Sequence, residues 1–275
     1  MTDPQRQARQ TQRRGVRPRS STFTLVLAGC AAIFFTLPLL ALLVRAPWGS
    51  ALDIVREPPI REAMRLSLVC SLAATALSFV FGVPLAWVQA RMSFPGRSLL
   101  RSVTTLPVVL PPVVGGLALL LALGRNGIVG RWLYDWFGVR LPFSTLGAII
   151  AETFVSMPFL VLSMEGAFAG SDQRLEEAAA TLGASRWTIL TRVTLPMLRP
   201  ALIAAGVLCW ARALGEFGAT ITFAGNFPGT TQTVPLAAYQ AFETNPPAAI
   251  VLSLVLVAIS LTVLVTLRHR LVGRA

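Results

Sequence analysis

The sequence contains no lysine and a single histidine, and each shortage excludes particular chemistry. All 24 basic residues are arginines, which excludes a Walker A loop, where a lysine grips the nucleotide phosphates, and any Schiff-base lysine. His269 alone cannot form an HExxH zinc site. The three cysteines, Cys30, Cys70 and Cys209, lie in apolar segments without CxxC spacing, and we interpret them as small buried hydrophobic residues. The sequence therefore predicts a protein that is not an enzyme and binds no metal ion or cofactor itself.

Charged residues are also scarce. They make up 13% of the 275 residues, whereas 54% are hydrophobic, and a soluble domain of this length needs far more charge on its surface. The apolar residues are grouped in long runs, and a helix of about 20 such residues spans the hydrocarbon core of a bilayer. A membrane-spanning segment must satisfy its own backbone hydrogen bonds, which favours helices over open strands. The sequence therefore predicts an all-α, polytopic membrane protein.

Six apolar segments are candidate transmembrane helices, at residues 23–44, 64–88, 99–123, 144–168, 197–224 and 247–267. They form one transmembrane domain, 23–267, between a basic N-terminal tail, 1–22, that is predicted to be disordered, and a short C-terminal tail, 268–275. Two short amphipathic patterns between the segments, 128–137 and 234–243, predict additional helices at the membrane interface.

The arginines predict how the chain is oriented. Sixteen of them lie in segments on the same side as the N-terminus, seven lie on the opposite side, and Arg212 lies within a span. Because arginine-rich loops stay in the cytoplasm, both termini are predicted to be cytoplasmic, in a multi-pass protein of the cytoplasmic membrane. The net charge of +12 comes from arginines that lie mostly on the cytoplasmic side of the membrane. We therefore expect no binding to nucleic acid.

The loop between the fourth and fifth segments, 169–199, contains the most informative pattern. Its polar and acidic start consists of Ser171, Asp172, Glu176 and Glu177. Ser171 is a predicted N-cap, the small residues from Ala178 to Ala180 favour a helix, and Gly183 is predicted to end that helix in the left-handed conformation. Ser185 is placed to cap a second short helix. Small side chains allow another backbone to approach closely, which suits a docking element. The alternative is an ordinary helical connection between two spans.

At fixed spacing, this loop resembles the EAA motif of permease subunits in binding-protein-dependent ABC importers. The matching residues are Glu177-Ala178-Ala179, Gly183, Leu195-Pro196 and Pro200, with Val193 where isoleucine is usual. The resemblance implies a type I ABC importer permease fold, in which the loop forms a coupling helix held in a groove of a cytoplasmic ATPase. The residues implied in this coupling are Glu176, Glu177, Ala178, Ala179, Gly183 and Pro196. ATP would then be used by the partner subunit and not by this chain.

Two further stretches, 106–115 and 212–236, are similar to the molybdate branch of these permeases, within a resemblance that covers about residues 60–245. The resemblance implies an ATP-driven importer of molybdate, and it leaves tungstate open as a cargo. Sulfate permeases have related segments, so a sulfate or thiosulfate permease stays open as the alternative. The implied partners are two copies of the ATPase, an extracytoplasmic oxyanion-binding protein and a second permease, which we expect to be another copy of this chain.

The same stretches contain the candidates for the translocation pathway or its gate, which are Pro107, Pro111, Pro112, Gly115, Arg212, Gly215, Glu216 and Thr220. Proline removes backbone donors, and irregular backbone at membrane depth is tolerated only inside protein or along a cavity, so the prolines either line the pathway or form a structural kink. Arg212 and Glu216, four residues apart on one helix face, either border the pathway or lock the packing. We expect Glu152 and Glu165 to lie near the ends of the fourth segment, where water can solvate a charged side chain more easily.

Two other classes of function are weighed against the permease. A self-sufficient secondary transporter or channel requires an ion-coupled charged relay within the spans, and only Arg212 and Glu216 are candidates for one. A membrane scaffold or signalling protein requires a sizeable soluble region for partners, and the sequence contains none. Both classes are therefore less well supported by the sequence than a permease.

Overall fold

The computed structural model describes residues 22–272, and over this range the chain forms helices and no strands. The chain divides at Arg45 into two units, which are described separately. The first unit contains α2 (Thr22–Arg45), an apolar helix that covers the first predicted span and buries none of its own residues. Cys30 on α2 is exposed, whereas Cys70 and Cys209 of the second unit are buried as predicted. The predicted basic tail lies outside the described residues except for Thr22.

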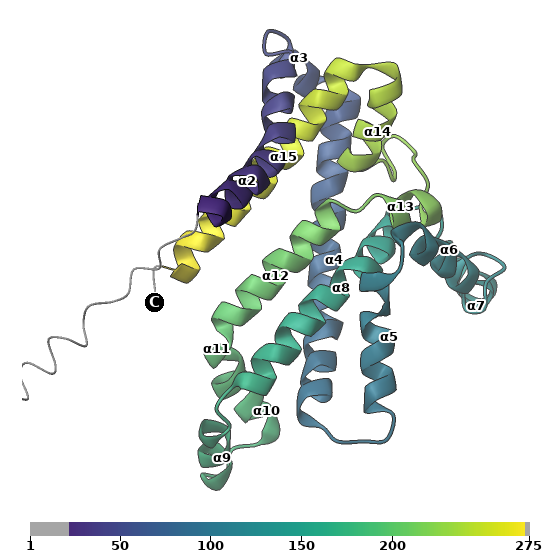
Figure 1. The fold of residues 1–275 in the computed structure, drawn as a ribbon. Coiled ribbons are helices and arrows are strands. Elements are labelled where there is room, and N and C mark those ends of the chain that lie inside the picture. Colours follow the sequence, from purple (N-terminus) through teal and green to yellow (C-terminus); the bar gives the residue numbers. More distant parts are fainter. Residues whose placement is uncertain (1–21, 273–275) are drawn as a thin grey trace, which may run out of the picture. The chain divides into compact units, whose positions relative to one another are not determined.

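The second unit contains the remaining helices (Figure 1). They are α3 (Ala51–Arg56), α4 (Pro58–Arg91), α5 (Arg97–Val109), α6 (Pro112–Leu123), α7 (Gly130–Phe137), α8 (Thr145–Gly170), α9 (Arg174–Thr181), α10 (Arg186–Ile189), the π-helix η1 (Leu190–Thr194), α11 (Leu195–Met197), α12 (Arg199–Leu214), α13 (Gly218–Phe223), α14 (Val234–Thr244) and α15 (Pro246–Val272). The two amphipathic patterns predicted between spans form α7 and α14.

The described residues include four helices that are long and apolar enough to cross a membrane, namely α2, α4, α8 and α15 as far as Val265. A fifth candidate is bent by 76° between the stretch Arg186–Met197 and α12. The all-α, polytopic prediction is therefore confirmed. However, two of the six predicted segments, the third and the fifth, are broken rather than continuous helices.

The third predicted segment is divided into α5 and α6 by an extended stretch at Leu110 and Pro111, whose ψ angles are 139° and 130°. The cause is the pair Pro111-Pro112, because each proline disfavours the helical region for the residue before it. Pro112 then starts α6, where its missing N–H leaves no helical hydrogen bond unmade.

The fifth predicted segment is also divided, because α12 ends at Leu214 and α13 begins at Gly218. Between them, a carboxylate oxygen of Glu216 accepts a hydrogen bond from the Ala219 backbone N–H at 2.7 Å. This bond satisfies one of the free N–H groups at the start of α13, so the side chain caps the second helix.

The core of the second unit lies where α4, α8 and α12 pack against one another (Figure 1). Its buried residues are Ala86, Leu160, Val161, Met164, Phe168, Leu198, Ala205 and Cys209. Small residues set the spacing of these helices. A Cβ on Gly82 of α4 would lie 3.0 Å from a Leu160 methyl group of α8, so the two helices are in close contact at this point.

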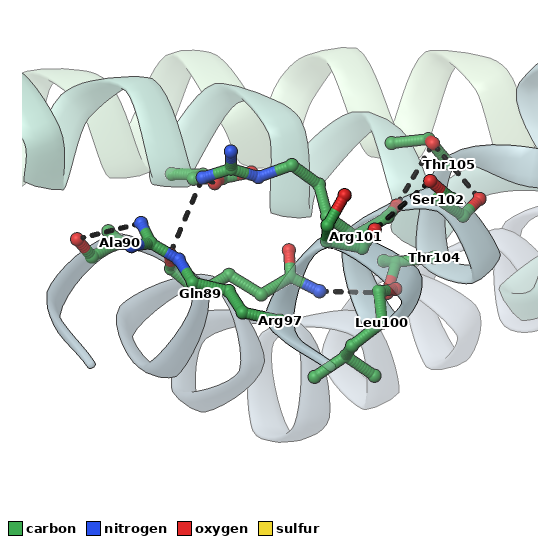
Figure 2. A network of polar contacts seen from close by, with 10 residues as sticks. Gln89, Ala90, Arg97, Leu100, Arg101, Ser102, Thr104 and Thr105 are labelled. Atoms are coloured by element: carbon green, nitrogen blue, oxygen red, sulfur yellow. Dashed lines mark hydrogen bonds and ion pairs between the residues drawn. The ribbon is translucent and has the colours of Figure 1, made fainter. Parts of the chain in front are cut away.

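A polar network ties α5 to the end of α4 (Figure 2). Arg97 donates to the backbone carbonyls of Gln89 at 2.7 Å and Ala90 at 3.4 Å, and Gln89 donates to the Thr104 hydroxyl at 2.8 Å. Arg101 donates to the Gln89 carbonyl and forms an ion pair with Glu165 of α8. The last carbonyls of a helix have no intrahelical partner and attract positive charge, so these two arginines stabilise the C-terminal end of α4.

Candidate functional site

The loop predicted to couple the chain to an ATPase folds into α9, α10, η1 and α11. The start of α9 differs from the prediction. Ser171 is the C-cap of α8 and not the N-cap of α9, which begins at Arg174 after Gln173. An oxygen of Asp172 instead accepts from the Arg174 backbone N–H at 3.0 Å. The acidic residue therefore anchors the start of α9, two positions before its first helical residue.

The end of α9 agrees with the prediction. Gly183 has a φ of +82°, the left-handed conformation that glycine adopts freely. Its N–H donates to the Ala180 carbonyl at 2.9 Å, and the Ala184 N–H donates to the Ala179 carbonyl at 3.0 Å. These two bonds form a Schellman motif, which reverses the chain and fixes the angle between α9 and α10.

The second short helix also follows the prediction. Ser185 caps α10, with its hydroxyl 3.1 Å from the Thr188 backbone N–H. The chain continues through η1 into α11, which contains Pro196, and then bends into α12. Pro196 has no N–H to donate, which suits a position where the π-helix gives way to a new helical turn.

Large apolar side chains on this loop are left uncovered by the rest of the chain. Leu182 is 88% exposed and Trp187 is 73% exposed, on either side of the Gly183 turn. Glu177 and Ala178 of α9 are exposed as well, so small side chains and apolar side chains share the free surface of the loop. An exposed apolar surface rimmed by polar residues is typical of a protein interface.

Glu176 is the acidic residue of α9 that contacts the rest of the chain. Its carboxylate lies 3.1 Å from the Arg91 guanidinium of α4 and 3.1 Å from the Thr194 hydroxyl of η1. Arg91 also donates to the Ser171 hydroxyl at 2.7 Å. Arg91 and Thr194 were not predicted as functional residues, because no local pattern relates either of them to Glu176.

The two broken segments meet in the structure. A Cβ on Gly218, at the start of α13, would lie 2.9 Å from Pro112 of α6, and a Cβ on Gly116 would lie 2.8 Å from the Ala219 carbonyl. The break between α5 and α6 therefore packs directly against the break between α12 and α13. The structure thus brings Pro111, Pro112 and Glu216 into one region. Irregular backbone of this kind is tolerated at membrane depth when protein covers it or when it lines a cavity.

The other pathway candidates lie on either side of this region. Pro107 lies within α5, and Gly115 packs near the Phe154 ring, 3.1 Å from an added Cβ. Gly215 follows the end of α12. Thr220 is fully buried, and its hydroxyl has no hydrogen-bond partner among the described residues.

Arg212 and Glu216 form an ion pair, with 2.6 Å between a guanidinium nitrogen and a carboxylate oxygen. The Glu216 side chain is 1% exposed and the Arg212 side chain is 27% exposed. Because the same carboxylate also caps α13, the pair stabilises the junction of α12 and α13. This geometry agrees with the packing interpretation of the pair, and Arg212 still reaches a more open environment.

The expectation for Glu152 is wrong, because this side chain is 1% exposed and is surrounded by protein instead of lying at a solvated helix end. One of its oxygens, Oε2, has no hydrogen-bond partner among the described residues. Glu165 is also buried, at 7% exposure, but it forms the ion pair with Arg101. Sequence position alone misjudged Glu152, because its burial depends on the helices that pack against α8, with α4 before it and α12 and α13 after it in the chain. A cavity of about 230 Å³ lies elsewhere, between the start of α4, α14 and α15.

Comparisons with known proteins agree with this architecture. Residues 62–275 match the family described as the inner membrane component of binding-protein-dependent transport systems. The chain is 45% identical to the molybdenum transport system permease protein ModB of Mycobacterium tuberculosis, over 83% of this chain and 86% of that protein. It is 37% identical to the sulfate transport system permease protein CysT of Escherichia coli, over 88% of this chain and 90% of that protein.

A solved structure shows the same fold. A bacterial ABC transporter that imports the acidic polysaccharide alginate contains a chain that superposes with a TM-score of 0.69 at 19% identity. The superposition covers 90% of this chain and 93% of that chain. At this level of identity the likeness concerns the fold alone, and it matches the type I importer permease fold expected from the sequence.

Proposed function

The chain belongs to the family of inner membrane components of binding-protein-dependent transport systems, and we propose that it is the permease subunit of an ATP-driven molybdate importer. As a multi-pass inner membrane component of such a system, it is a transport subunit and not an enzyme. The relative at 45% identity is a molybdenum permease, whereas the sulfate permease is 37% identical, and this difference favours molybdate as the cargo.

The observation that carries the proposal is the loop from α9 to α11. A glycine reversal with left-handed backbone holds two short helices at a fixed angle, and apolar side chains on both sides of it are exposed. Such a rigid, partly apolar projection suits insertion into a groove of a partner protein. In this proposal the partner is a cytoplasmic ATPase in two copies, which uses the ATP.

The remaining partners follow from the same proposal. An extracytoplasmic binding protein delivers the oxyanion, and a second copy of this chain completes the conduit. The arginine distribution supports an orientation with both termini in the cytoplasm, which places the loop beside the ATPase. In the membrane, the meeting point of the two broken segments, near Pro112 and Gly218, is the proposed location of the pathway or its gate.

Few charged groups in this region are free to bind an anion. Arg212 is already paired with Glu216, and Glu216 also caps a helix. A pathway that binds its cargo weakly releases it quickly, so selectivity in this proposal belongs to the external binding protein. The permease contributes the route and the coupling.

The cargo is tested by reconstituting the complete complex, with its own ATPase and binding protein, in liposomes. We expect molybdate to stimulate ATP hydrolysis and to accumulate in the vesicles, and we expect sulfate at equal concentration to do so much less. Tungstate, a tetrahedral dianion of similar size, serves as the close analogue. Stimulation by sulfate or thiosulfate without stimulation by molybdate would replace the proposal with the sulfate permease alternative.

A further inference from the structure

A partly buried junction joins the coupling loop, α9 to α11, to the membrane helices, and Arg91 lies at its centre. This arginine is in the last turn of α4, and its side chain is 10% exposed. It donates to the Glu176 carboxylate of α9 at 3.1 Å and to the Ser171 hydroxyl at the end of α8 at 2.7 Å. One guanidinium therefore connects three helices.

Glu176 is the counterpart of Arg91 on the loop. Its side chain is 20% exposed, and its carboxylate also accepts a hydrogen bond from Thr194 of η1 at 3.1 Å. The carboxylate thus holds α9 both to α4 and to the segment that leads into α12. Charge-assisted hydrogen bonds in a poorly hydrated site are stronger and more directional than exposed ion pairs.

The helix that receives this contact belongs to the core of the second unit. α4 packs along α8 and α12, with Ala86 of α4 buried among Leu160, Val161 and Met164 of α8. Close-packed helices move as units because their interfaces do not deform continuously. A displacement applied at α9 therefore reaches the membrane helices through a short and stiff contact.

We propose that the ion pair between Arg91 and Glu176 is the link that transmits a displacement of α9 to α4, and that Arg91 is a positioning residue for energy coupling. The proposal rests on the proposed function, because it requires an ATPase that moves α9. It differs from the docking role of the exposed loop surface, since Arg91 is only 10% exposed and contacts Glu176, whereas Glu177 and Ala178 form part of the exposed surface. Arg91 acts on transport through Glu176 and does not contact the cargo.

The test uses the full complex with ATPase and binding protein, and compares Arg91→Gln, Glu176→Gln and the double variant. The readouts are assembly of the complex, ATP hydrolysis stimulated by the loaded binding protein, and the number of molybdate ions transported per ATP. We expect each single variant to assemble and hydrolyse ATP but to transport at least about fivefold less molybdate per ATP. The double variant should lose no more than either single variant, because both changes remove one interaction.

Arg101→Gln is the control variant, because it removes an arginine–glutamate pair between α5 and α8 and leaves α9 untouched. It also removes one hydrogen bond to the Gln89 carbonyl at the end of α4, but this carbonyl keeps the shorter bond from Arg97. We expect this variant to keep the normal transport per ATP even if it lowers the thermal stability of the complex. The exchange variant Arg91→Glu with Glu176→Arg restores opposite charges and is expected to recover much of the coupling. This variant decides the question if either single variant fails to fold.

Three results would overturn the link. These are wild-type transport per ATP in the assembled Arg91→Gln and Glu176→Gln variants, an equal loss in Arg101→Gln, and an assembled exchange variant that stays uncoupled. Failure of the proposed function looks different, because the wild-type complex itself would then show no ATP-dependent uptake of molybdate.

Discussion

At the scale of single residues, Gly183 carries the sharpest structural requirement of the coupling loop. Its φ of +82° lies in the left-handed region, and an added Cβ would have no atom within 4 Å. A Cβ atom would therefore not clash, and we expect the effect of a substitution to come mainly from the left-handed backbone. This makes the position suitable for a test of conformation without a steric complication.

We predict that Gly183→Val uncouples transport, because a β-branched residue in the left-handed region strains the backbone by about 1–3 kcal/mol. The strain would tilt α10 against α9, so that ATP hydrolysis no longer drives molybdate uptake and fewer ions are transported per ATP. Asparagine adopts this conformation far more readily, so Gly183→Asn is the matched control and should retain most of the activity. Equal uptake by the valine variant and the wild type in reconstituted vesicles would refute the coupling role of this turn.

The glycine turn could be predicted because its determinants are local. A run of alanines, a glycine and a capping serine specify α9, the reversal and α10 within a dozen or so residues of sequence. The long-range partners of the same loop could not be predicted. The contact between Arg91 and Glu176 depends on the packing of α4 and α8, and no local pattern encodes it. Ser171 was assigned to the wrong helix for the same reason, since its hydroxyl is used by the end of α8 and by Arg91.

At the scale of helices, the fold depends on breaks that composition alone does not reveal. Residues 99–123 and 197–224 are apolar enough to be taken for continuous spans, and hydropathy predicts them as such. The prolines at 111 and 112 divide the first of these, and Gly215 with Glu216 divides the second. The sequence predicts pathway lining or a kink at the prolines, but it predicts no break at Gly215 and Glu216, and the part that these residues play in a pathway stays a prediction.

The two breaks are complementary, and small residues make their contact possible. We predict that Gly116→Ala destabilises the packing of α6 against α13, because the added methyl group would lie 2.8 Å from the Ala219 carbonyl and 3.0 Å from the Ala219 Cα. Backbone atoms cannot rotate away as a flexible side chain can, so we expect a loss of about 1–3 kcal/mol. The change would appear as a lower midpoint of thermal unfolding for the purified chain in detergent.

Gly166→Ala on α8 is the control for this change, because an added Cβ there meets no atom within 4 Å. Alanine favours a helix over glycine by up to about 1 kcal/mol, so this variant should be as stable as the wild type or more stable. If both alanine variants unfolded at the same temperature as the wild type, the close contact between α6 and α13 would not contribute to stability.

At the scale of the whole molecule, the arrangement of charge distinguishes a permease from a self-powered transporter. The ionisable groups buried in the described spans are mostly used in the structure itself. Glu216 is held by Arg212 and by a helix start, and Glu165 is held by Arg101. Glu152 is the exception, because one of its oxygens has no partner among the described residues. A single unpaired carboxylate does not form a chain of proton or ion carriers across a membrane.

In the proposed function the energy for transport enters through the coupling loop, and this consequence can be measured directly. We predict that vesicles containing this chain alone take up no molybdate, either with or without an imposed proton or sodium gradient. Uptake should appear when the ATPase, the binding protein and ATP are all present. An ATPase variant that binds ATP without hydrolysing it provides the matched control and should give no accumulation. Gradient-driven uptake by the chain alone would show that Glu152 or another buried group couples transport to an ion, because no other source of energy would be available.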